Sequence, residues 1–348
     1  MKYNHSCLSL LARGREGHRL AAEARNVLIH LDNVRLRELI EPADLIESIR
    51  NGFNGGLESP TRMHQTIPGA HPSTLLIMPA WQRGGDIGIK LVTVDAWRGQ
   101  QGGQAVHGVY VLLDGASGGV SALLDARVLT AARTAGVSAL ASSMLAREDA
   151  STLLMIGTGN LAADLVQMHR SVRNYTRVLV WGRNFAKAQV LAARLQASGA
   201  DATCEAANDL AAAVACADTV CCATASAKPL VHGGDLAPGT HVDLIGSFTP
   251  AMREADDDVF RSARVIVDTY DGMRESGDLL DPVATGALDA TQVRDLAALL
   301  SDAALTRRNA EEITVFKAVG SAIADLAVAQ FFLRRHHETP MTGTGVIR

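Results

Sequence analysis

Apolar and polar positions follow two different patterns along the chain, and the pattern changes near residue 148. In the first part, short apolar runs rich in β-branched residues are separated by glycine pairs, which is typical of strands joined by turns. They are residues 74–79, 86–94 and 106–114. These runs predict an antiparallel or mixed sheet, preceded from Val27 by a short strand and two helical stretches that are split at Glu41-Pro42.

After residue 148, apolar runs alternate with helical stretches, as in a parallel sheet that is covered by helices. Between the two parts, residues 130–147 consist mainly of Ala, Ser and Leu and predict a helix that packs closely on its neighbours. Near the end, residues 313–335 form one long apolar-periodic segment, which we expect to return to the first part.

Composition places the chain among globular proteins. Hydrophobic residues make up 47% and charged residues 20%, while aromatic residues make up only 4%, so we expect a core of Ala, Val, Leu and Ile. A length of 348 residues predicts two domains. The net charge is −4 and no long run of basic residues occurs, so we expect no nucleic-acid partner.

Hydropathy and cysteine content bear on the compartment. No uncharged apolar run reaches the roughly 18 residues that a membrane-spanning helix needs, so we expect no membrane partner. The five cysteines form no CxxC pair, which favours reduced thiols in the cytoplasm and gives no spacing for a metal site. Residues 1–26 lack a secretory pattern and are predicted to be an N-terminal extension.

A glycine-rich turn carries the most specific chemistry. An apolar strand over residues 151–157 leads into Gly157-Thr158-Gly159-Asn160-Leu161-Ala162, a GxGxxA turn that opens a helix. Such a turn admits the pyrophosphate of a dinucleotide to the helix N-terminus, whereas the alternative is a plain glycine turn of an α/β unit. We therefore predict an α/β fold, with a Rossmann dinucleotide-binding domain over residues 149–317. Residues 27–148 are predicted to form a mixed α+β domain, completed by residues 318–348.

The end of the second strand of that domain bears on the coenzyme. An acid at this place would bind the ribose 2′-hydroxyl of NADH, but the chain has Arg183 and Asn184 there. Arg183 can form charge-assisted hydrogen bonds with a 2′-phosphate, so we expect NADPH, with NADH as the second choice. The alternative is that Arg183 is a solvated loop cation. Thr224 and Ser247, which follow later strands, are expected to line the cofactor.

Three cations of the first domain are candidates for substrate binding. Lys90 lies inside an apolar strand, on the same face as Gly88 and Val92, where a lysine is badly placed unless that face lines a site. Arg62 precedes a strand, and Arg133 lies in the helix of small residues. The alternatives are that Lys90 protects a sheet edge and that both arginines are ordinary surface cations.

A series of segments, in order along the chain, makes the sequence resemble the ornithine cyclodeaminase/μ-crystallin family from about Val27 to the C-terminus. The segments are the one around Arg62, GIKLVTV with Lys90, LLDARVLTAARTAGVSALA with Arg133, MIGTGNLA, IGSFTPAMREAD, ESGDL and ITVFKAVGSAIADLA. The resemblance implies a Rossmann domain plus a substrate and dimerisation domain, and hence a homodimer. It also implies that Arg62, Lys90 and Arg133 hold a substrate carboxylate beside the nicotinamide.

Two positions depart from the cyclodeaminases of that family. Phe248 and Leu76 stand where those members carry an acid, and neither side chain can accept a proton or pair with an ammonium group. The segment GSFTPAMRE instead resembles the ketimine reductases of the family. This resemblance implies NAD(P)H-dependent reduction of a small cyclic imino acid, either Δ1-pyrroline-2-carboxylate to L-proline or Δ1-piperideine-2-carboxylate to L-pipecolate.

The proton donor and two other functions stay open. His64 is the candidate donor to the imine nitrogen, with an ordinary surface histidine as the alternative. The other functions are an ornithine cyclodeaminase or another amino-acid dehydrogenase of the family, and a non-catalytic protein that binds NADPH.

Overall fold

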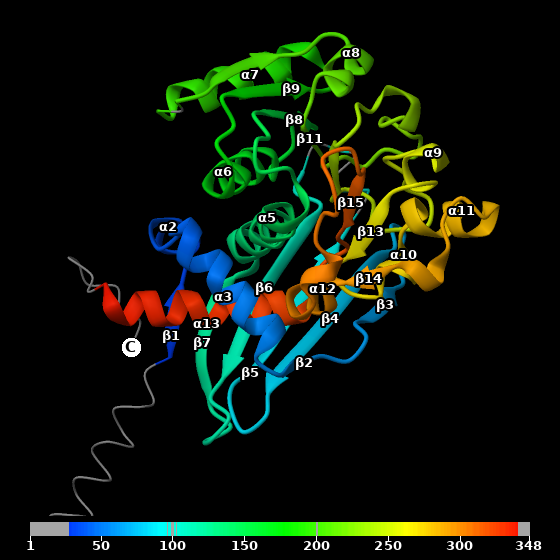
Figure 1. Ribbon diagram of the computed structural model, residues 1–348. Coiled ribbons are helices and arrows are strands. Elements are labelled where there is room, and N and C mark those ends of the chain that lie inside the picture. The colour runs from blue at the N-terminus through cyan, green and yellow to red at the C-terminus, as the bar shows by residue number, and fades with distance from the viewer. Residues whose placement is uncertain (1–27, 96, 99–100, 102, 200, 340–348) are drawn as a thin grey trace, which may run out of the picture.

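Two β-sheets with a long helix between them organise the chain (Figure 1). The computed structural model describes residues 28–339 except 96, 99, 100, 102 and 200. The N-terminal extension expected over residues 1–26 lies outside these residues.

The first sheet has seven strands in the order β1-β7-β6-β5-β4-β2, and β3 also pairs with β4. The strands are β1 (Ile29–Leu31), β2 (Leu57–Glu58), β3 (Met63–Ile67), β4 (Ser73–Gln82), β5 (Ile87–Val94), β6 (Val106–Leu113) and β7 (Val120–Asp125). Only β1 and β7 run parallel, so the sheet is mixed. The sequence pattern does not predict β7, because no turn residue separates it from the helix that follows.

The second sheet has eight strands, all parallel, in the order β10-β9-β8-β11-β12-β15-β13-β14. The strands are β8 (Thr152–Ile156), β9 (Arg177–Trp181), β10 (Thr203–Ala206), β11 (Thr219–Cys222), β12 (His241–Leu244), β13 (Arg264–Val267), β14 (Arg294–Asp295) and β15 (Thr314–Lys317). This sheet confirms the predicted α/β class with a Rossmann-type domain.

Helices connect the strands and cover both sheets. The longer helices are α3 (Pro42–Asn54), α5 (Ala126–Leu145), α6 (Ala162–Val172), α7 (Phe185–Ala197) and α13 (Ala322–Glu338). The shorter helices are α2 (Asn33–Glu38), α8 (Leu210–Ala215), α9 (Asp257–Phe260), α10 (Gly272–Glu275), α11 (Gly277–Thr285) and α12 (Leu296–Ser301).

Helix α5 lies at the centre of the molecule and contacts α3, α6 and α13. Asp125 caps its N-terminus by accepting hydrogen bonds from two backbone amides of the first turn. Its small residues allow close packing, since a Cβ added to Gly136 would lie 2.5 Å from side-chain atoms of both Leu45 and Ile49. By length and composition α5 could cross a membrane, but 83% of its apolar window is buried within the protein, as expected of a core helix.

The C-terminal apolar segment over residues 313–335 forms two elements. Its first residues form β15, which lies between β12 and β13 in the second sheet, and its later residues form α13. Gly320 breaks the segment because it takes a φ of +96°, and Ser321 then caps α13. Figure 1 shows α13, in red, crossing the first sheet beside α3, and α13 contacts α3, β4 and β5.

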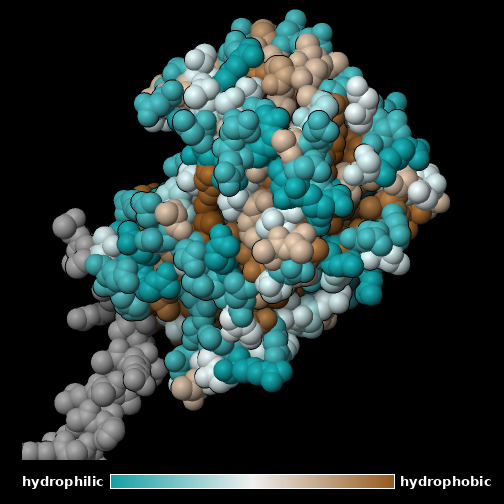
Figure 2. All heavy atoms as spheres, viewed as in Figure 1, coloured by the Kyte–Doolittle hydropathy of each residue, from teal (hydrophilic) through white to brown (hydrophobic). Residues whose placement is uncertain are grey.

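The two faces of the first sheet differ in burial. The face that packs on helices carries Met78, Ala80, Lys90, Tyr110 and Leu112, all buried. The opposite face is also apolar, but its side chains are only partly buried, namely Leu75, Ile77, Ile89, Leu91, Val109 and Val111. Elsewhere polar side chains dominate the surface in view, and apolar ones show mainly in its hollows (Figure 2).

Candidate active site

The glycine turn follows β8 and opens α6. Gly157 has a φ of +119°, and a Cβ added to it would lie 2.6 Å from the carbonyl oxygen of Ala223, so this position requires glycine. A Cβ added to Gly159 would meet nothing within 4 Å, which leaves open space at this residue. Asn160 is exposed, and Leu161 stands at the N-cap position of α6 without a side-chain cap hydrogen bond. The turn therefore has the room and the free amide donors that a phosphate group of a dinucleotide needs.

The end of β9 lies against this turn. A Cβ added to Gly182 would lie 2.8 Å from Cγ2 of Thr158, so the two segments touch there. Arg183 is exposed, and no ion pair engages it within the part of the chain that the structure describes. The side chain of Asn184 caps α7 by accepting a hydrogen bond from the Lys187 amide at 3.2 Å. Arg183 is thus free to meet an anion, whereas Asn184 holds the helix.

One buried carboxylate fixes the loops that follow β11 and β12. Glu254 accepts hydrogen bonds from the amide and the hydroxyl of Thr224 at 2.7 and 3.0 Å. It also accepts from the amides of Gly246 and Ser247 at 2.6 and 3.1 Å. Burial raises the pKa of Glu254, and the ammonium of Lys317, 3.9 Å away, opposes this shift. Thr224 and Ser247 are therefore positioned by a single side chain.

The hydroxyl of Ser247 points into the protein. It donates to the carbonyl oxygen of Met252 at 2.7 Å and lies 2.8 Å from the hydroxyl of Ser276, and the whole residue is buried. This side chain holds the loop, so its expected contact with a cofactor stays a prediction.

Two of the three predicted cations meet on one carboxylate. Lys90 on β5 and Arg133 on α5 both point at Asp325 of α13, and all three side chains are buried. Nζ of Lys90 lies 2.9 Å from Oδ1 and 2.7 Å from Oδ2 of Asp325, and Nε of Arg133 lies 3.0 Å from Oδ1. Burial lowers the pKa of Lys90 to about 8, although Asp325 opposes the shift.

The third cation is engaged by a different acid. Arg62 pairs with both carboxylate oxygens of Glu275 on α10, and its Nη1 donates to the carbonyl oxygen of Val319 at 3.0 Å. Nε2 of His64 lies 3.6 Å from Oε1 of Glu275, and the side chain of His64 is about half exposed. Loss of hydration and the nearby Arg62 lower the pKa of His64, so the ring is mostly neutral at pH 7.

The segment between β15 and α13 joins these cations to the parallel sheet. Asp268, directly after β13, accepts hydrogen bonds from the amides of Val319 and Gly320 at 3.2 and 2.7 Å. A Cβ added to Gly320 would lie 2.8 and 2.9 Å from the two terminal nitrogens of Arg133, so glycine lets this guanidinium approach. The cations therefore lie at the carboxyl ends of the parallel strands, where α/β proteins bind their ligands.

The two positions that are expected to differ from the cyclodeaminases lie at different sheets, one in a loop and one on a strand. Phe248 is 45% exposed on the loop after β12. Leu76 on β4 is paired in register with His64 on β3 and Val92 on β5.

Sequence reasoning missed the acids that hold the site. Asp325, Glu275 and Glu254 lie within segments that carried the family resemblance, but they are not among the predicted site residues. A signal for Asp325 is present in the sequence, because an acid inside the apolar segment AIADLAVAQ has to find a cationic partner if it is buried. No comparable local signal marks Glu275, since it lies in a polar segment.

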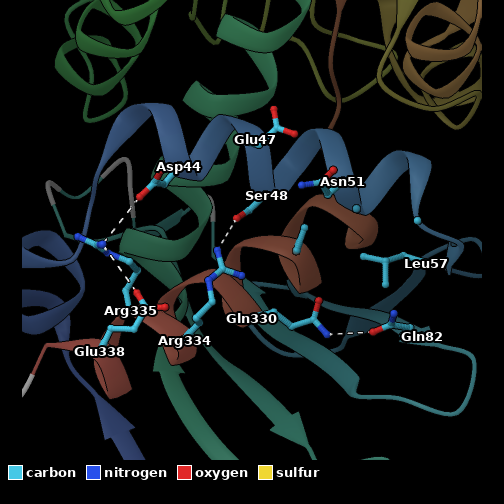
Figure 3. Close-up of a pocket in the computed structure, with 13 residues that line it drawn as sticks. Asp44, Glu47, Ser48, Asn51, Leu57, Gln82, Gln330, Arg334, Arg335 and Glu338 are labelled. Atoms are coloured by element: carbon cyan, nitrogen blue, oxygen red, sulfur yellow. Dashed lines mark hydrogen bonds and ion pairs between the residues drawn. The ribbon is translucent and has the colours of Figure 1, made fainter.

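A separate groove between α3 and α13 is not part of this site (Figure 3). It has a volume of about 480 Å³ and is lined mainly by polar and charged side chains. Arg334 donates to Ser48 at 2.9 Å, and Arg335 lies 3.8 Å from Asp44, so polar contacts link the two helices along it. Ala327 lines the groove, and two residues of a helix correspond to about 200°, so Asp325 points to the other side of α13.

A buried polar cluster lies between the second sheet and its helices. The ligand atoms of His169, Cys221 and Asp243 lie within 4.8 Å of one another, a spacing that could hold a metal ion. Nε2 of His169 also lies 3.0 Å from both Ser138 Oγ and Asp243 Oδ2, so hydrogen bonds within the cluster link these groups. The expectation that the chain holds no metal stays a prediction.

Comparison with known proteins places this geometry in context. The model of the ornithine cyclodeaminase/mu-crystallin family matches residues 26–339. The Delta(1)-pyrroline-2-carboxylate reductase of Paracoccus denitrificans is 36% identical over 294 residues, which cover 84% of this chain and 92% of that protein.

Two solved structures have the same fold as this chain. The Delta(1)-pyrroline-2-carboxylate reductase of Thermococcus litoralis, in complex with NADH and L-proline, superposes with a TM-score of 0.82 at 28% identity, covering 89% of this chain and 98% of the other. A probable ornithine cyclodeaminase from Bordetella pertussis superposes with a TM-score of 0.78, also at 28% identity, covering 88% and 96%.

Proposed function

We propose that this chain, which belongs to the ornithine cyclodeaminase/mu-crystallin family, reduces a cyclic ketimine carboxylate with NAD(P)H. The substrates would be Δ1-pyrroline-2-carboxylate, giving L-proline, and Δ1-piperideine-2-carboxylate, giving L-pipecolate. The reductases among its relatives support this reaction class, since one covers most of this chain at 36% identity and another shares its fold.

The observation that carries the proposal is the gathering of three cations at the carboxyl edge of the parallel sheet. Arg62 directly precedes β3, Lys90 lies on β5 and Arg133 lies on α5, and all three side chains are buried or nearly so. Burying three cations together is costly unless anionic partners compensate. Asp325 and Glu275 compensate in part, and a substrate carboxylate would add a further negative charge.

Each residue has a role that follows from its surroundings. A bound nicotinamide would supply hydride to the imine carbon, and the turn at Gly157 and Gly159 has the open space and amides to hold its pyrophosphate. Lys90 and Arg133 would bind the carboxylate and so fix the imine carbon in place, which is most of what the reaction requires of the protein. His64 remains the candidate proton donor, although its lowered pKa means that only a minor fraction of the ring carries a proton to donate at pH 7.

Cyclodeamination is disfavoured by the chemistry at two positions. Ornithine has a second ammonium group and must lose a proton from its amine, and both requirements call for a carboxylate. Phe248 and Leu76 offer none. A non-catalytic role is disfavoured as well, because a protein that only bound NADPH would not need three cations beside the coenzyme site.

We propose that the protein uses nicotinamide dinucleotides and that it prefers NADPH to NADH. Arg183 is exposed at the end of β9, and the segment Gly182-Arg183-Asn184 contains no acid to bind a ribose 2′-hydroxyl. The guanidinium can bind a 2′-phosphate through two parallel hydrogen bonds.

We also propose a homodimer in the cytoplasm. The outer face of the first sheet carries apolar side chains that are only partly buried, including Ile77, Ile89 and Val109, and a second copy could cover them.

A pair of assays tests the proposed reaction. NADPH oxidation is followed with Δ1-pyrroline-2-carboxylate and with Δ1-piperideine-2-carboxylate, and ammonia release is followed with L-ornithine and NAD+. We expect imine reduction and no detectable ammonia. Ammonia release without imine reduction would show that the protein is a cyclodeaminase instead.

A further inference from the structure

The carboxylate of Asp325 contacts two of the substrate-binding cations at once. It is fully buried, it lies 2.7 to 2.9 Å from Nζ of Lys90, and it accepts a hydrogen bond from Nε of Arg133 at 3.0 Å. Lys90 and Arg133 are 43 residues apart in sequence and lie on a strand and a helix, so no local structure sets their separation. Asp325, on a third element, brings them side by side.

The contact with Asp325 uses only part of the Arg133 guanidinium. Nε is the atom that donates to Asp325, and the two terminal nitrogens lie over the backbone of Gly320. A guanidinium held at Nε keeps its terminal nitrogens free for a second, bidentate carboxylate. Arg62 differs, because Glu275 already pairs with its Nε and Nη2, and the carbonyl oxygen of Val319 accepts a hydrogen bond from its Nη1.

Opposing influences act on the protonation of Lys90. Burial, Arg133 and Arg62 all favour the neutral amine of Lys90, and Asp325 favours the ammonium. Tyr110, paired in register with Lys90 on β6, is also buried and stays neutral because burial raises its pKa. Asp268 faces Arg133 and Arg62 from the end of β13. Asp325 is therefore the only acid that contacts Lys90 among the described residues.

We propose that Asp325 is a positioning residue that holds Lys90 and Arg133 side by side, both charged, as one receptor for the substrate carboxylate. This inference rests on the proposed function, because it assumes that a carboxylate substrate binds there. It assigns different roles to the three cations: Lys90 and Arg133 receive the carboxylate, and Arg62 is held by Glu275.

Kinetics of Asp325→Asn test the inference. We expect KM for the imine to rise at least tenfold and KM for NADPH to stay within twofold. In the parent kcat/KM should fall as pH rises through about 8, the pKa of Lys90, and in Asp325→Asn this fall should move to lower pH because the amine loses its acid. Asp325→Glu should recover part of the loss. The control is Asp86→Asn, the same change at a carboxylate that contacts α13 through Gln330 at 3.0 Å.

Titration of Lys90 tests the inference without any substrate. The chain has five lysines, so 13C-labelled lysine gives a spectrum in which Lys90 can be assigned with Lys90→Arg. We expect a midpoint near 8 in the parent and a lower one in Asp325→Asn. If the parent reduces no imine, the proposed function fails while this titration still reports on Asp325. An unchanged midpoint together with an unchanged KM for the imine would overturn the inference.

A third measurement covers the case that Asp325→Asn does not fold. Removing one partner of a buried pair leaves an unpaired charge, whereas removing both relieves it. Lys90→Met with Asp325→Asn should therefore be more stable to heat than Asp325→Asn alone, in which the ammonium of Lys90 has lost the acid that contacts it. Additive losses in the double variant would show that the two side chains do not depend on each other.

Discussion

The side chains of Lys90 and Arg133 are buried, so replacing them tests whether they bind the substrate carboxylate. Lys90→Met and Arg133→Met should each lower kcat/KM for the imine by roughly a hundredfold or more, because a substrate carboxylate without a partner in a dry site costs about 3 kcal/mol. Steady-state kinetics with NADPH in excess measure this loss. Arg83→Met is the control, since the side chain of Arg83 is 85% exposed on the same domain. Activity within threefold of the parent in either buried variant would mean that the cation is structural.

Arg183 is the residue on which the proposed preference for NADPH depends. Arg183→Ala should raise KM for NADPH about ten- to a hundredfold, because it removes a charge-assisted contact that contributes roughly 1.5 to 3 kcal/mol. It should leave KM for NADH nearly unchanged, because NADH has no 2′-phosphate. The comparison of the two coenzymes in one variant is the measurement. Equal effects on both would indicate that Arg183 supports the loop rather than binding the phosphate.

Helix α13 is the element that completes the site, and its packing on α3 is tight at one point. A Cβ added to Gly52 of α3 would lie 2.7 Å from Cβ of Ala327. Gly52→Val should therefore destabilise the protein by about 1 to 3 kcal/mol and lower kcat/KM as well, because α13 carries Asp325. Thermal unfolding is the measurement, with Asn51→Ala, at an exposed residue of α3, as control. Equal melting temperatures for the two variants would contradict this account.

The elements that the sequence predicts are those with a local signal. The strands β4, β5 and β6 are apolar runs between turns. The GxGxxA spacing of the turn at Gly157 is typical of dinucleotide-binding domains. The break at Gly320 has no such signal, because a glycine between two apolar stretches also fits a continuous helix. Its left-handed conformation is set by amides that Asp268 holds from a different strand.

The candidate site is predictable only in part, for a related reason. Arg62, Lys90 and Arg133 stand out as cations in apolar or family-like segments, so sequence reasoning finds them singly. Their partners lie far away in the chain: Asp325 is 235 residues from Lys90, and Glu275 is 213 residues from Arg62. No periodicity or motif links positions that distant, so only the folded chain reveals which acid holds which cation.

At the scale of the whole molecule, the outer face of the first sheet predicts self-association. Light scattering after gel filtration should give twice the chain mass of 36.8 kDa. Ile89→Lys, which places a charge on that face, should give monomers, because an unpaired charge is costly inside an apolar interface. Val190→Lys is the matched control, since Val190 is 70% exposed on α7 of the other domain. A monomeric parent, or a dimer that survives Ile89→Lys, would exclude this face as the interface.

The passage of the chain from β15 into α13 also fixes the order in which the two sheets can be covered by helices during synthesis. Strands β1 to β7 leave the ribosome before the parallel sheet, but the helix that covers β4 and β5 is encoded after that sheet. Domains of a nascent protein usually fold in the order in which they emerge. In this chain the first sheet emerges before the second, yet α13 covers part of its apolar inner face only after the whole parallel sheet has been synthesised.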